Sequence, residues 1–160
     1  MTSPGLAEWP IGVADDRVRS EVSAVIGDGD DAWIRASRDV LCWRVKTRSG
    51  FVVGDDDPVR AGARQTITFR ILGVTIREPI KVVEVHASDA RVGFSYRTRP
   101  GHPVSGEEAF IVSRDGDAVV LTVRSLTAPS PRQPWRAAFP LLRIAQAIVR
   151  RRYLRALRVG

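Results

Sequence analysis

Residues 91–114 read RVGFSYRTRPGHPVSGEEAFIVSR, which is two runs of alternating side chains joined by a segment rich in proline and glycine. In the first run Val92, Phe94 and Tyr96 share one face, and in the second run Phe110 and Val112 do. In the first run Arg91 and Arg97 lie on the opposite face. Because successive side chains of a strand point to opposite sides, this pattern is typical of strands with one buried and one wet face. We therefore predict an antiparallel hairpin here.

Similar runs continue on both sides of this hairpin. They occupy residues 17–27, 43–53, 63–72, 74–86 and 119–127, with glycine, aspartate and proline marking the turns between most of them. Asp30 is a suitable N-cap for a short helix that ends near Trp43. After a proline-rich linker, apolar residues recur at helical spacing from Ala138 to Ala156.

The order of these elements predicts the fold class. A strand, a helix, six further strands and a final long helix suit an α+β domain in which a curved antiparallel sheet of about six to seven strands wraps round the C-terminal helix (β-α-β6-α). Residues 1–16 are predicted to be an irregular N-terminal segment, and residues 17–160 a single domain. A chain of 160 residues is long enough to bury such a core.

The positive charge of the chain lies in its last part. Residues 1–117 hold 16 basic and 18 acidic side chains, whereas residues 118–160 hold nine arginines and no acidic residue. Lys46 and Lys81 are the only lysines in the chain. Arginine therefore dominates throughout, and part of the high isoelectric point reflects amino-acid usage rather than a partner.

Several classes of protein are not supported. Cys42 is the sole cysteine, so no internal disulfide forms, and two histidines supply no structural zinc site. No segment approaches the roughly 20 apolar residues of a membrane span, and no export signal precedes the strands. Residues 27–32, GDGDDA, match a dinucleotide fingerprint in spacing, but three aspartates would face the pyrophosphate. We expect a cytoplasmic protein with no membrane span, metal or cofactor.

Two charged residues fall on faces that are otherwise apolar. If Phe110 faces the interior, the period of a strand sends Glu108 the same way, where the hydroxyl of Tyr96 ends the apolar stripe. A buried carboxylate is unfavourable unless it is paired or protonated. Arg152 lies within the apolar arc of the final helix, so Arg152 or His102 is a candidate partner. The contact is either a structural lock between sheet and helix or the polar end of a ligand pocket.

The stretch that begins at Tyr96 resembles a family signature, Tyr-Gly-Thr-Leu-Pro-Gly-His-Pro-x-x-Gly-Glu-Glu-x-Phe. The signature is that of domain of unknown function 1990, also called uncharacterised protein family 0548. The likeness covers the chain from about residue 17, including the tail RRYLRAL at 151–157. The positions that match the signature are Tyr96, Thr98, Pro100, Gly101, His102, Pro103, Gly106, Glu107, Glu108 and Phe110.

The resemblance implies a helix-grip fold, because the family is similar to the START and pollen-allergen superfamily. That superfamily encloses apolar ligands between its sheet and its C-terminal helix. Arg97 and Arg99 depart from the signature, which has glycine and leucine there. Ala128 also stands where the family has an arginine, so any function of that arginine would be absent here.

We keep three hypotheses for function. The first is a binding domain for a small, largely apolar ligand with an acidic or polar group, contacted by Tyr96, Thr98, His102, Glu108 and Arg152. The second is an enzyme of the same fold in which His102 or Glu108 carries a proton. The third is an interaction protein whose arginine-rich final helix binds an acidic partner. Nucleic acid is not favoured as that partner, since no groove-reading motif or set of stacking aromatics accompanies the arginines.

Overall fold

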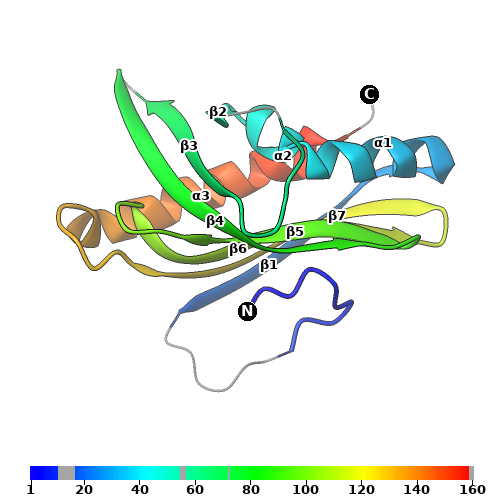
Figure 1. Ribbon diagram of the computed structural model, residues 1–160, viewed down its shortest axis with the longest axis horizontal. Helices are drawn as coiled ribbons and strands as arrows, with labels where there is room; N and C mark the ends of the chain where they lie inside the picture. The colour runs from blue at the N-terminus through cyan, green and yellow to red at the C-terminus, as the bar shows by residue number, and fades with distance from the viewer. Residues whose placement is uncertain (11–16, 55–56, 72, 159–160) are drawn as a thin grey trace.

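The structure is a computed structural model that describes residues 1–10, 17–54, 57–71 and 73–158. Within these residues the chain forms a seven-stranded antiparallel sheet with the order β1-β7-β6-β5-β4-β3-β2. The sheet is curved, and helix α3 runs along its concave side (Figure 1). The strands are β1 (Val18–Asp28), β2 (Phe51–Val52), β3 (Arg64–Ile71), β4 (Val74–Ala87), β5 (Arg91–Thr98), β6 (Val104–Asp115) and β7 (Ala118–Pro129).

In the described residues, three helices accompany the sheet: α1 (Gly29–Leu41), α2 (Arg44–Thr47) and α3 (Trp135–Ala156). The register of β1 shifts between Val25 and Gly27, and that of β4 shifts between Val82 and Glu84. Such bulges bend and twist a strand, which helps a long antiparallel sheet to curl. The predicted α+β class and the strand order along the chain are confirmed.

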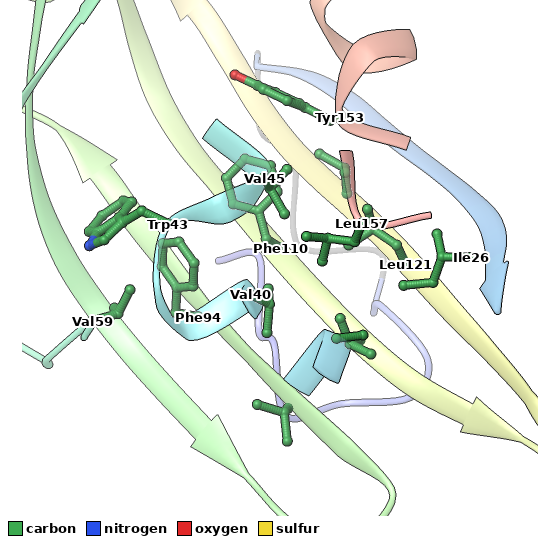
Figure 2. Close-up of a cluster of buried hydrophobic side chains, with 14 of the residues drawn as sticks. Ile26, Val40, Trp43, Val45, Val59, Phe94, Phe110, Leu121, Tyr153 and Leu157 are labelled. Atoms are coloured by element: carbon green, nitrogen blue, oxygen red, sulfur yellow. The ribbon is translucent and has the colours of Figure 1, made fainter. Parts of the chain in front are cut away.

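One end of the concave face is closely packed. There α1, the connection to α2 and the last turn of α3 meet the inner side chains of β5 to β7 (Figure 2). The ring of Trp43 packs edge-on against Phe94, with centroids 4.8 Å apart, and Phe110 meets Tyr153 in the same manner at 5.1 Å. Phe110 is fully buried. This end supplies most of the hydrophobic core.

Between α1 and β2 the structure differs from the strand that the sequence predicts. Alternating apolar residues predict a strand over 43–53, but Arg44–Thr47 forms the short helix α2 and only Phe51–Val52 pairs with β3. The backbone of Trp43 has φ = 59°, a left-handed conformation that is rare for a bulky residue. Its carbonyl accepts the amides of Lys46 and Thr47. Burial of the indole therefore outweighs the local strand preference and starts a helical turn.

Residues 1–10 lie on the convex side of the sheet, away from the helices (Figure 1). They contain no helix or strand, and residues 11–16 lie outside the described residues, so the irregular segment over residues 1–16 stays a prediction. The guanidinium of Arg124, which is almost fully buried, donates to the backbone carbonyls of Ser3, Leu6 and Ala7 and to the carboxylate of Glu21. The segment is thus fixed to β7. The domain boundary at residue 17 stays a prediction.

A glycine sets the start of β6. A side-chain carbon at Gly106 would lie 1.8 Å from the backbone oxygen of Leu126 on β7, which is impossible without moving the backbone. The amide of Gly106 donates to the hydroxyl of Thr98 at 2.9 Å. β5, β6 and β7 are therefore held in close approach at this point, one residue before Glu107 and Glu108.

Candidate functional site

The other end of the concave face is hollow. A cavity of about 270 Å³ lies between the sheet and the first four turns of α3. Small-molecule sites commonly have volumes of roughly 300–1,000 Å³, so this cavity is slightly smaller than that range. Its apolar walls come from both layers: Phe51, Phe69, Ile76, Pro103, Val104 and Leu126 on one side, and Ala138, Leu141, Leu142, Ala145 and Val149 of α3 on the other.

A buried lysine occupies the inner end of this cavity. Helix α2 places the side chain of Lys46, which is 3% exposed, against the sheet. Its Nζ lies 3.0 Å from Oε2 of Glu108 and donates a hydrogen bond of 2.6 Å to the hydroxyl of Tyr153. The hydroxyl of Tyr96 donates to the same oxygen of Glu108. The carboxylate predicted to face inward is therefore paired, and its partner comes from α2.

Aromatic rings surround this ion pair. The ammonium of Lys46 lies 4.7 Å from the ring centre of Phe51 and 4.9 Å from that of Tyr153, within the range of cation–π attraction. Burial, and then the nearby charge of Glu108, raise the pKa values of Tyr96 and Tyr153 well above their usual range. Both phenols therefore stay neutral at physiological pH. The cluster carries one positive and one negative charge that largely cancel.

Glu78 and Ser125 also line the cavity, and they lack such partners in the described part of the chain. The carboxyl of Glu78 reaches it from β4, and no side chain among the described residues donates a hydrogen bond to it. Burial raises the pKa of Glu78, and Lys46 partly opposes that effect. Ser125 on β7 is buried, and its hydroxyl has no hydrogen-bond partner in the part of the chain that the structure describes. A buried unpaired hydroxyl is unfavourable by about 1–3 kcal/mol, so a ligand group that satisfied it would gain that much.

The loop between β5 and β6 is fixed by its own side chains. Nδ1 of His102 accepts the amide of Val104 at 3.1 Å, so the proton of the neutral imidazole sits on Nε2. Burial and the charge of Lys46 lower the pKa of His102 to about 3. Thr98 accepts the amide of Gly106. Both residues line the cavity, but each already stabilises the hairpin.

Four of the five predicted site residues meet at the cavity, and Arg152 does not. Tyr96, Thr98, His102 and Glu108 line it, whereas Arg152 is exposed and is not among its lining residues. The predicted contact of Glu108 with Arg152 or His102 is replaced by the pair with Lys46. Binding of a ligand by these residues stays a prediction.

We did not predict Lys46 or Glu78 as site residues, although each carried a signal. Ile76, Glu78 and Ile80 alternate in the same way as Glu108 and Phe110, so the period of the strand alone places the carboxyl of Glu78 on the inner face. Lys46 is one of two lysines in a chain that otherwise uses arginine. It lies on α2, within the residues 43–53 that the sequence pattern predicts to be a strand.

Comparison with known families identifies the chain. The family described as domain of unknown function (DUF1990) matches residues 3–156. The chain belongs to this family. The DUF1990 match starts well before residue 17, where we placed the beginning of the resemblance, so it includes the N-terminal segment that Arg124 holds. Ala128, where we noted a missing family arginine, is not among the cavity-lining residues.

A curated relative supports the same family. A UPF0548 protein of Deinococcus radiodurans is 43% identical over 60 residues, which are 37% of this chain and 26% of that protein. The match thus spans about a quarter of the length of that relative. No helix in the described part of the DUF1990 chain is long and apolar enough to cross a lipid bilayer.

Solved structures share the fold at low sequence identity. A hypothetical protein of Helicobacter pylori is 18% identical with a TM-score of 0.59, and the match covers 98% of this chain and 96% of that one. A protein of Mycobacterium smegmatis is 12% identical with a TM-score of 0.61 over 89% of each chain. The ginseng (Panax ginseng) major latex-like protein 151 is 14% identical with a TM-score of 0.51 over 84% of this chain and 97% of that one. The helix-grip fold is confirmed.

Proposed function

We propose that this DUF1990 domain binds a small, largely apolar ligand in the cavity between the sheet and α3. The observation that carries the proposal is the buried hydroxyl of Ser125, which lacks a partner in the described part of the chain and lines a cavity with otherwise largely apolar walls. Binding sites for small molecules usually combine such walls with a few convergent polar groups. The carboxyl of Glu78, to which no described side chain donates a hydrogen bond, is a second such group.

The charges in the cavity favour a particular polar group on the ligand. The positive charge of Lys46 is already matched by Glu108 at 3.0 Å, and Arg152 is outside the site. A ligand carboxylate would therefore meet Glu78, and no other lysine or arginine among the described lining residues is available to balance the two negative charges. A hydroxyl or an amine can donate to Glu78 and satisfy Ser125. We accordingly narrow the expected acidic or polar group of the ligand to a hydrogen-bond donor.

The enzyme hypothesis gains less support. His102 has a pKa of about 3 and stays neutral near pH 7, and Glu108 already accepts bonds from Lys46 and Tyr96. Neither is well placed to carry a proton in each turnover. An interaction role for the arginine-rich helix is compatible with a binding site beneath it. The cytoplasmic location remains a prediction.

Blocking the cavity from α3 tests the binding. Ala145 lines the cavity, while Ala147 lies on the same helix outside the lining set and is exposed. We expect native mass spectrometry of protein purified from its own host to show a retained small molecule in the wild type and in Ala147→Phe. Ala145→Phe should lose it. Equal retention in both variants would place the ligand elsewhere and contradict the proposal.

Paired probes test the polar group. With 1-octanol and octanoate, which share an alkyl chain, isothermal titration calorimetry should give tighter binding of the alcohol by about tenfold, because the carboxylate faces Glu78. Glu78→Gln removes that repulsion and should narrow the difference. Tighter binding of octanoate to the wild type would contradict the assignment of a hydrogen-bond donor.

A further inference from the structure

Helix α3 is apolar on two faces, and only one of them faces the protein. The inner face contacts the cavity through residues that include Ala138, Leu142, Ala145 and Val149. On the outer side Ile144 and Ile148 are 61% and 53% exposed, and Leu141, which also lines the cavity, is 71% exposed. These three residues recur at helical spacing, so they form one continuous stripe. We call it the outer stripe.

Arginines flank the outer stripe. Arg136, Arg143 and Arg150 recur every seventh residue along one side of it, and Arg151 and Arg155 follow at its C-terminal end. None of these guanidiniums forms an ion pair with another described residue, and no acidic residue follows Asp117 in the sequence. The stripe therefore has a purely positive border.

We propose that the outer stripe of α3 docks on an anionic phospholipid surface. A helix with an apolar face bordered by Lys or Arg lies in the interface of a bilayer, where its apolar side chains enter the acyl boundary and its cations meet lipid phosphates. The length of α3, 22 residues, and its place on the outside of the fold allow it to lie flat on such a surface (Figure 1). The cavity under α3 would then adjoin the lipid.

The chemistry of the stripe selects a bilayer over two other occupants. A second copy of the helix would bring two arginine borders together with no acidic residue from either helix to separate them. A nucleic acid would match the arginines but would place Leu141, Ile144 and Ile148 against phosphates. An anionic bilayer matches both the charge and the apolar side chains.

Vesicle co-sedimentation of the full chain tests this proposal. We expect binding to vesicles of phosphatidylcholine mixed with phosphatidylglycerol, weaker binding at high salt, and little binding to phosphatidylcholine alone. Ile144→Ser with Ile148→Ser should weaken binding by about tenfold or more, because two buried apolar side chains are lost. Arg136→Gln and Arg143→Gln should each weaken it by about fivefold.

Matched substitutions elsewhere serve as controls. Val74 on β4 is 60% exposed and Arg64 on β3 is exposed, so Val74→Ser and Arg64→Gln change an exposed β-branched apolar residue and an exposed arginine away from α3. They should leave vesicle binding unchanged. All the substituted residues are exposed, so the substitutions should not disturb the core. Thermal unfolding of each variant at the same temperature as the wild type verifies that the fold is retained.

Three results would overturn the proposal. The first is no binding of the wild type to anionic vesicles. The second is equal loss of binding in the α3 variants and the controls. The third is a dimer in analytical ultracentrifugation that Ile144→Ser with Ile148→Ser dissociates, which would make the stripe an interface between copies. These results do not depend on the cavity ligand, so the failure of either proposal is recognisable by itself.

Discussion

The two ends of the concave face differ although the same strands build both. At the packed end, α1 and the last turn of α3 press against Phe94, Phe110 and Leu121, and these side chains are fully or almost fully buried (Figure 2). At the hollow end the roof is the earlier part of α3, where Leu141 and Ile144 remain largely exposed. Stability therefore concentrates at one end of the sheet, and space for a ligand remains at the other.

The position of the charged cluster explains this division. Lys46 and Glu108 lie where the packed end meets the hollow end, and Tyr96 and Tyr153 bridge from the core to that pair. A buried ion pair contributes little net stability compared with apolar packing, but it fixes geometry. The cluster thus forms a rigid inner wall for the cavity, supported from behind by the core.

Truncating one side chain from each end should show the largest contrast. Phe110→Ala removes a fully buried ring at the packed end and should lower the free energy of unfolding by about 3–5 kcal/mol. Leu142→Ala changes a half-buried residue that faces the cavity and should cost less than about 1 kcal/mol, because few atoms pack against it. Urea unfolding measures both values. Similar costs would mean that the two ends are equally packed.

Removing the cation between the two ends should have the next largest effect. Lys46→Met leaves Glu108 with only the hydroxyl of Tyr96 and should cost about 3 kcal/mol at neutral pH, since the carboxylate loses its buried partner. Adding Glu108→Gln to this variant should recover much of the loss, because no buried charge remains. The same unfolding measurement on both variants checks this. A double variant no more stable than Lys46→Met would show that the pair itself contributes the stability.

The histidine of the hollow end should produce a smaller effect that depends on pH. The pKa of His102 is about 3 in the folded protein and near 6.5 when unfolded, so the unfolded state takes up the proton first as pH falls. Its contribution to stability is present above pH 6.5 and is lost on acidification, by about 2 kcal/mol between pH 7.5 and pH 5. The raised pKa of Glu78 has the opposite effect, because its contribution to stability increases as pH falls.

The variant His102→Asn isolates this contribution. An asparagine oxygen can accept the amide of Val104 but does not titrate, so the variant keeps the bond and loses the proton site. Urea unfolding at the two pH values should show a smaller loss of stability in the variant than in the wild type. Parallel losses would mean that His102 is accessible to protons in the folded state.

Much of the fold follows from the period of the strands, and the failures have a common physical origin. Residues 91–98 alternate and form β5, the first strand of the predicted hairpin. Residues 43–53 also alternate, yet the burial of Trp43 in a left-handed conformation produces α2 instead. Local pattern reports which side chains prefer burial. It does not report which backbone path satisfies that preference when a large ring must fill a particular space.

The candidate site was predictable where it depends on strands and not where it depends on helices. Glu108 faces inward as its position in β6 requires. Arg152 was assigned to the apolar arc of α3 because Ile148 and Ala145 flank it, but Ile148 belongs to the outer stripe and Ala145 to the inner face. When a helix has two apolar faces, a residue between them cannot be assigned to the inner face from the sequence alone. Predicting Lys46 as a site residue would have required the position of α2, and no short-range sequence pattern indicated that helix.

The close approach of the β6 and β7 backbones at Gly106 limits which substitutions this domain can accept during evolution. Contact between backbones leaves no room for any other residue there, so a lineage that keeps the fold must keep this glycine. The neighbouring positions that line the cavity, such as Thr98 and Ser125, contribute side chains that substitution can alter. Descendants of one ancestor can therefore acquire different ligand preferences while inheriting the same frame.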